Sequence, residues 1–167
     1  MKEQIYRLNT LRKLFYRTRL LRHLELFAYR DLRFSFADLY LFVNEMPLLV
    51  ELHLILFESL DVDCMKYVVL KAPNLEHLNI EGGTRVYDSY IKEISHLVML
   101  MSLDVSCCEL ITDAGLIQFA REIRCLHFLN IEDISSISAR YVTKVEICYQ
   151  TFKNLLVLKY LGRLKHV

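Results

Sequence analysis

The chain has 167 residues, of which 54% are hydrophobic and 11% aromatic, and it contains only 4 Gly and 2 Pro. This composition suffices for one packed core and excludes a disordered or low-complexity chain. The 21 Lys and Arg almost balance the 20 Asp and Glu, for a formal net charge of +1. No overall charge therefore draws the chain to nucleic acid or to a membrane.

Residues 1–20 are basic and carry apolar side chains at helical spacing. No long apolar run follows these charges, which excludes a typical signal peptide. We expect residues 1–20 to form an N-terminal capping helix or a degraded repeat. The alternative is that their basic side chains contact RNA, an acidic partner or anionic lipid, although nucleic acid is not the partner we expect.

One phrase, L-x-x-L-x-L, recurs along the rest of the chain, with Ile, Val or Tyr at the last position of some copies. It occupies residues 21–26, 49–54, 75–80, 100–105, 126–131 and, more weakly, 155–160. Its middle leucines follow one another at steps of 28, 26, 25, 26 and 29 residues. Leucine-rich repeats have periods of about 20–29 residues, so the pattern predicts a strand at each phrase.

The second half of each unit also repeats. An apolar residue after each strand is followed by Ser35, Asp61, Tyr87, Thr112 or Ser138, and four of these five are good helix N-caps. Two further apolar columns follow, in the helix (Leu39, Met65, Ile91, Leu116, Val142) and before the next strand (Met46, Ala72, Leu97, Ile123, Phe152). The sequence therefore predicts an α/β leucine-rich-repeat solenoid over residues 21–167. It would be a horseshoe arc of about five to six strand–helix repeats with a concave parallel sheet.

The fourth unit carries a family resemblance. Residues 100–116 read LMSLDVSCCELITDAGL, which resembles the cysteine-containing repeat L-x-x-L-D-L-S-x-C-x-x-I-T-D-x-G-L. That repeat occurs in the F-box/LRR substrate receptors of cullin-RING ubiquitin ligases. The resemblance implies that Cys108 is buried and links adjacent repeats. It also implies substrate recognition in an SCF-like ubiquitin ligase pathway.

The F-box of that family is not found in this sequence. An F-box needs roughly 40 helical residues ahead of the repeats, and only about 20 precede Leu21. A cullin-ligase adaptor would then bind through a missing or separate module, and the chain could be a fragment. A scaffold or assembly factor that acts without ubiquitin, or an enzyme-inhibiting repeat protein, is the alternative.

The cysteines indicate where the protein works. Their number is odd and they have no regular disulfide spacing: Cys64, Cys107, Cys108, Cys125 and Cys148. The chain also has no Asn-x-Ser/Thr acceptor, and its most apolar window, residues 39–57, is too polar to span a bilayer. We expect reduced thiols and a cytoplasmic or nuclear location without membrane contact.

The strand side chains that point away from the leucines form the candidate binding face. We expect a protein partner to contact His23, Glu25, Phe27, Glu51, His53, Ile55, His77, Asn79, Glu81, Asp104, Ser106, Phe128, Asn130 and Glu132. Phe27, Ile55 and Phe128 are the expected anchors, because apolar groups within a polar rim dominate interface energetics. A metal site built from the histidines and carboxylates is the alternative, and we favour the binding face.

No catalytic or phosphate-binding motif occurs in the sequence: there is no G-x-x-x-x-G-K-[ST], G-x-G-x-x-G, H-E-x-x-H or G-x-S-x-G. We therefore expect a binding protein rather than an enzyme, with no cofactor and no resident metal.

Overall fold

The computed structural model describes residues 19–27, 36–58, 60–138 and 157–159. Its strands are β1 (His23–Phe27), β2 (Glu51–Ile55), β3 (His77–Asn79), β4 (Ser102–Asp104), β5 (Phe128–Asn130) and β6 (Val157–Lys159). Its helices are α2 (Phe36–Glu45), α3 (Val62–Lys71), α4 (Asp88–Ile94) and α5 (Asp113–Glu122). Strands and helices alternate along the chain from β1 to β5, as the repeat predicts.

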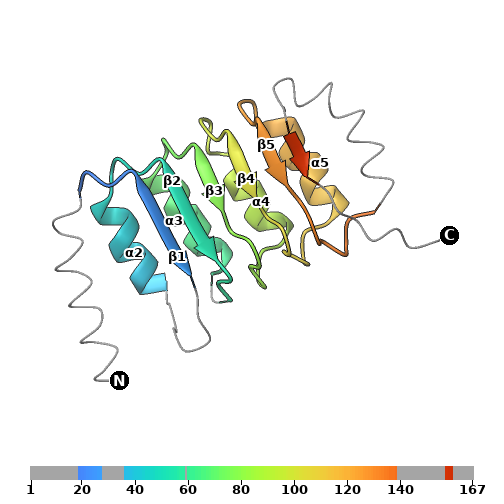
Figure 1. Cartoon of the computed structure of the whole chain (residues 1–167), viewed down its shortest axis with the longest axis horizontal. Helices are drawn as coiled ribbons and strands as arrows, with labels where there is room; N and C mark the ends of the chain where they lie inside the picture. Colours follow the sequence, from blue (N-terminus) through green and yellow to red (C-terminus); the bar gives the residue numbers. More distant parts are fainter. Residues whose placement is uncertain (1–18, 28–35, 59, 139–156, 160–167) are drawn as a thin grey trace.

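The strands form one six-stranded sheet in which the order of the strands is the order of the chain, β1-β2-β3-β4-β5-β6. Every neighbouring pair is parallel. The four described helices lie side by side along one face of this sheet (Figure 1). The α/β class and the parallel sheet are therefore confirmed.

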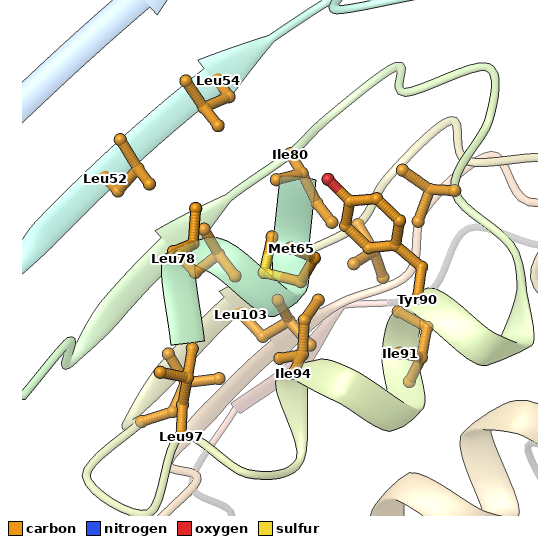
Figure 2. Close-up of a cluster of buried hydrophobic side chains, with 14 of the residues drawn as sticks. Leu52, Leu54, Met65, Leu78, Ile80, Tyr90, Ile91, Ile94, Leu97 and Leu103 are labelled. Carbon is orange, nitrogen blue, oxygen red and sulfur yellow. The ribbon is translucent and has the colours of Figure 1, made fainter. Parts of the chain in front are cut away.

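The repeated leucines build the core between the sheet and the helices. The middle leucine of each phrase lies in register with its neighbours, so that Leu52 pairs with Leu78 and Leu78 with Leu103, and all three are buried. Figure 2 shows these leucines packing with Met65 of α3 and with Ile91 and Ile94 of α4. Because each strand alternates its side chains, one face of the sheet supplies the core and the other carries the intervening residues, most of which are polar.

The other apolar columns are confirmed wherever the structure describes them. The buried members are Leu39, Met65, Ile91 and Leu116 in the helices, Leu60, Val86, Ile111 and Ile137 before them, and Met46, Ala72, Leu97 and Ile123 after them. The remaining expected members, Phe34, Val142 and Phe152, lie outside the described residues, as do Ser35 and residues 1–18. The boundary expected at residue 20 stays a prediction.

Asp61 and Thr112 both occupy the expected N-cap positions, but only Asp61 makes the expected side-chain bond. The Asp61 carboxylate accepts from the Cys64 N–H at 3.0 Å and caps α3. Thr112 precedes α5 but makes no such bond to its own helix. Its backbone N–H and its hydroxyl donate instead to the carboxylate of Asp88 in the preceding unit, at 2.8 and 2.6 Å.

Ser138 repeats this arrangement one unit later. Its backbone N–H and its hydroxyl donate to the Asp113 carboxylate, at 3.0 and 2.5 Å. At both positions the hydroxyl donates to a carboxylate, which is a stronger acceptor than a neutral oxygen. These bonds join consecutive units along the edge where the helices begin.

Each strand from β2 to β5 is followed by a turn with the same backbone conformation. We call these the exit turns, and they contain Leu56, Gly82, Cys107 and Asp133, with φ of 61°, 69°, 59° and 55°. Gly82 suits this left-handed region, which side chains with a Cβ rarely adopt. Gly82 thus allows a tight exit from β3.

Candidate protein-binding face

The sheet face opposite the helices, here called the open face, carries two side-chain columns in the predicted register. The first aligns His23, Glu51, His77, Ser102 and Phe128, and the second aligns Glu25, His53, Asn79, Asp104 and Asn130. A third column begins with Phe27 paired to Ile55. Backbone bonds between the exit turns and the next unit extend it to Glu81, Ser106 and Glu132. The structure thus brings all the expected residues to one face.

A cluster of histidines and carboxylates occupies the β1–β2 end of the open face. The Glu51 carboxylate is bonded to the Nδ1 of His23 and lies 2.9 Å from the Nε2 of His53. The Nδ1 of His53 lies 3.9 Å from a carboxylate oxygen of Glu25. The hydrogen bond from His23 lowers the pKa of Glu51, and this outweighs partial burial, which acts in the opposite direction.

The histidines and carboxylates of this cluster are also the residue types of the metal alternative. Within the described ranges, no group of three or more His, Cys, Asp or Glu residues is placed to hold a metal ion. The imidazoles and carboxylates pair with one another instead, so the cluster supplies hydrogen-bonding groups to the open face.

A series of side-chain bonds stabilises the ends of the strands in the middle of the sheet. Asn79, Asp104 and Asn130 each accept, through a side-chain oxygen, from the backbone N–H two residues later, at 2.9 to 3.1 Å. Asn130 also donates to Asp104 at 2.8 Å, and the Ser106 hydroxyl donates to Asp104 at 2.6 Å. The three bonds to backbone N–H groups are Asx turns, in which the side chain replaces a backbone partner.

The Asx turns change what part of the expected face a partner can reach. Ser106 and Asn130 are each only 6% exposed, so these two side chains offer little surface. Their contribution is to the shape of the strand ends. The sequence contains the pattern of these turns, an Asn or Asp at the same position of three successive units. The prediction of contact residues takes no account of it.

Apolar and acidic side chains divide the strand-exit end of the open face. Phe27 is 50% exposed and Leu56 is 54% exposed, with the half-buried Ile55 between them. Farther along the sheet, the same edge carries the half-buried Glu81 and the exposed Asp133. Leu56 and Asp133 were not among the expected contact residues, because the left-handed turn that presents them has no signature in a strand pattern.

Cys108 is fully buried, as the resemblance implies, and its thiol donates to the carbonyl oxygen of Ile80 in the preceding unit at 3.3 Å. Burial raises the pKa of Cys108 to about 12. Cys107 is exposed on its exit turn. Desolvation raises its pKa, and so do the nearby carboxylates, first among them Asp133 and Glu81. Both residues therefore remain thiols at neutral pH and are weak nucleophiles.

Cys64 and Cys125 are also free. No helix in the described part of the chain is long and apolar enough to cross a membrane.

Solved structures of low sequence identity share this fold. One chain of the yeast Rad7 and Elc1 complex matches with a TM-score of 0.61 at 13% identity, over 80% of this chain. The actin-binding site 2 of leiomodin-1 matches with a TM-score of 0.63 at 13% identity, over 77% of this chain and 80% of its own length. The tropomodulin C-terminal domain of Caenorhabditis elegans matches with a TM-score of 0.60 at 12% identity, over 78% of this chain and 84% of its own.

This chain spans 42% of the length of the chain matched in the yeast complex. No protein-family profile matches the sequence, and no curated protein matches it. At these identities the likeness shows a shared fold.

Proposed function

We propose that this chain is a leucine-rich-repeat solenoid that binds another protein through the open face of its sheet. One observation carries the proposal: side chains from five parallel strands align in columns on a sheet face that no described helix covers. Stacked repeats create an extended surface of this kind, and such surfaces serve protein recognition.

The chemistry of the face supports a protein ligand. Half-exposed Phe27 lies on the same face as the hydrogen-bonding groups of Glu51 and His53, and this mixture of aromatic and polar groups is typical of interfaces. Two of the similar structures are a complex of two proteins and an actin-binding site. We propose binding without catalysis, since the buried thiols of Cys64 and Cys108, each with a pKa raised to about 12, do not suit nucleophilic chemistry.

A matched pair of substitutions tests the proposal. Ser102 lies half-buried at the centre of the open face, and Ser89 is exposed on α4 on the opposite side of the sheet. The measurement is quantitative affinity purification with the unmodified chain and with each variant. We expect at least one protein to be captured by the unmodified chain and by the Ser89→Arg chain, and to be lost with Ser102→Arg. Identical sets of captured proteins for the two variants would exclude the open face as the binding site.

A narrower candidate is substrate recognition in a ubiquitin ligase pathway. It is supported by the resemblance of residues 100–116 to the cysteine-containing repeat and by the buried bond from Cys108 to Ile80, which joins two units as that resemblance implies. Under this hypothesis, affinity purification recovers a cullin-ligase adaptor. The protein that Ser102→Arg no longer captures should also be degraded more slowly in cells that carry the Ser102→Arg chain than in cells that carry the unmodified chain. A complete absence of ubiquitin ligase components would favour the scaffold or inhibitor alternative.

A further inference from the structure

Apolar and acidic side chains follow one another along the strand-exit end of the open face. Resting on the function proposed above, we propose that the partner presents a basic segment that crosses the exit turns from β2 to β5 and places an apolar side chain against Phe27 and Leu56. The apolar groups lie at one end of this edge and the acidic groups at the other.

The apolar end lies at β1 and β2. Phe27 is the last residue of β1 and pairs in register with Ile55, the last residue of β2. Leu56 follows on the first exit turn, where its side chain would contact any Cβ added at Gly82, at 2.5 Å from Leu56 Cδ2. Phe27 and Leu56 are each about half exposed in spite of their size. Covering them would remove apolar surface from water, which favours binding.

The acidic end lies at β3 to β5. Its carboxylates come from four positions at or just beyond the strand ends: Glu81, Glu109, Glu132 and Asp133. No ion pair joins any of them to a lysine, arginine or histidine of the described residues. Three of them lie close enough to the Cys107 thiol to raise its pKa. Within the described residues, no ion pair therefore neutralises their negative charge.

The spacing of the strands sets the length of the segment. Neighbouring strands lie about 4.8 Å apart, so the path from β2 to β5 covers three spacings, or about 14 Å. An extended chain advances about 3.3 Å per residue. An apolar side chain seated on Leu56 would thus precede or follow the basic residues that reach Asp133 by about four residues.

Charge complementarity favours this occupant over two others. A second copy of the chain that docked through this same edge would bring carboxylates against the same carboxylates, which costs free energy. The phosphates of a nucleic acid would be repelled in the same way. Lysine and arginine side chains are attracted by these carboxylates, and the gain grows as the apolar contact excludes water.

Binding of defined peptides tests the proposal. The probe is a fluorescein-labelled peptide of about nine residues with one leucine and, about four residues away, a run of arginines. The control peptide has glutamate in place of each arginine. We expect anisotropy to show binding of the arginine peptide alone, with an affinity that falls as salt rises from about 50 to about 300 mM. Binding of both peptides, of neither, or without dependence on salt would overturn the proposal.

Two pairs of substitutions locate the site. Glu81→Gln with Asp133→Asn keeps the shape of each side chain, and Asn tolerates the left-handed φ of residue 133. We expect this pair to weaken arginine-peptide binding by about three- to tenfold. The matched pair Asp63→Asn and Glu93→Gln removes two carboxylates from α3 and α4 and should leave the affinity unchanged. Equal effects of the two pairs would refute the assigned site.

The two proposals can fail separately. If a protein captured by the chain is lost with Ser102→Arg but is retained by the Glu81 and Asp133 variant at every salt concentration, the open face binds protein and the basic segment is wrong. If capture does not depend on Ser102, the proposed function itself fails. Unchanged thermal midpoints of the variants show that each chain is folded.

Discussion

Replacing Gly115 by alanine tests how neighbouring units are joined. Gly115 lies buried in the first turn of α5. A Cβ built there would lie 2.2 Å from Asp88 Oδ1, 2.4 Å from Asp88 Cγ and 2.9 Å from Asp88 Cβ. The carboxylate would have to move, and it is the group that accepts both bonds from Thr112. Gly115→Ala should therefore break the connection between the units that contain α4 and α5.

Two opposing contributions set the magnitude of the change in stability. Each bond to the carboxylate contributes about 1 kcal/mol at this exposed edge, so two lost bonds cost about 2 kcal/mol. Alanine recovers up to about 1 kcal/mol through its better helix propensity. We expect Gly115→Ala to lower the free energy of unfolding by about 1–2 kcal/mol, which for a chain of this size lowers the thermal midpoint by about 2–8 °C.

A double-mutant cycle provides the control. Denaturant unfolding followed by circular dichroism measures Gly115→Ala in the unmodified chain and in Asp88→Ala, where no carboxylate remains to be displaced. In the second background we expect the net cost to fall below about 0.5 kcal/mol, because no hydrogen bond is lost and the better helix propensity of alanine offsets the close approach of the two Cβ atoms, 2.9 Å. An equal cost in both backgrounds would show that Gly115→Ala does not act through the Asp88 carboxylate and would place its effect elsewhere in the core.

Three further measurements test the core and the open face. Leu103→Ala, at a fully buried position, should cost about 2–5 kcal/mol in denaturant unfolding, and a variant with unchanged stability would contradict the repeat assignment. Tyr90→Phe should raise the free energy of unfolding by about 1 kcal/mol, because the buried Tyr90 hydroxyl has no hydrogen-bond partner in the described part of the chain; a less stable variant would reveal such a partner. Glu51→Gln tests linkage to pH: because His23 lowers the pKa of Glu51 below 4.5 in the folded chain, the carboxylate stabilises the fold above that pH. We expect a stability difference between the two chains of less than about 1 kcal/mol, since Glu51 is partly exposed. This difference should disappear as the pH falls through the lowered pKa of Glu51. A difference that persists in acid would contradict the bond to His23.

The register of the sheet could be predicted from the sequence because a strand has a period of two. A slip of one residue would move leucines such as Leu78 and Leu103 to solvent, so only one alignment buries them. The columns of the open face follow from the same alignment. The buried position of Cys108 came from its resemblance to a known repeat and not from the period.

The bonds between units could not be predicted in the same way. Thr112 precedes a helix and carries a hydroxyl, which suits a cap equally well as a donor to another unit. The decisive feature is the carboxylate of Asp88, 24 residues earlier. One unit before Asp88 the aligned position is Val62, so the carboxylate is missing there. Recognising it requires comparing neighbouring units rather than reading one helix at a time.

The exposure of the open face also depended on local geometry. Asn130 belongs to the same column as Glu25, yet its Asx turn and its bond to Asp104 bury it. Column membership therefore predicted which side of the sheet a residue occupies and did not predict how much of it a partner can touch.

The order of the strands has a consequence for how the chain folds. Because every strand pairs with the next one along the chain, each sheet contact closes a loop of only about one repeat, and no step requires distant parts of the chain to meet. Such a chain has a low contact order, and folding can begin in any unit and spread to its neighbours. Each inner unit has a neighbour on both sides. Amide hydrogens of β3 and β4 should therefore exchange with solvent more slowly than those of β1, where opening needs the loss of a single interface.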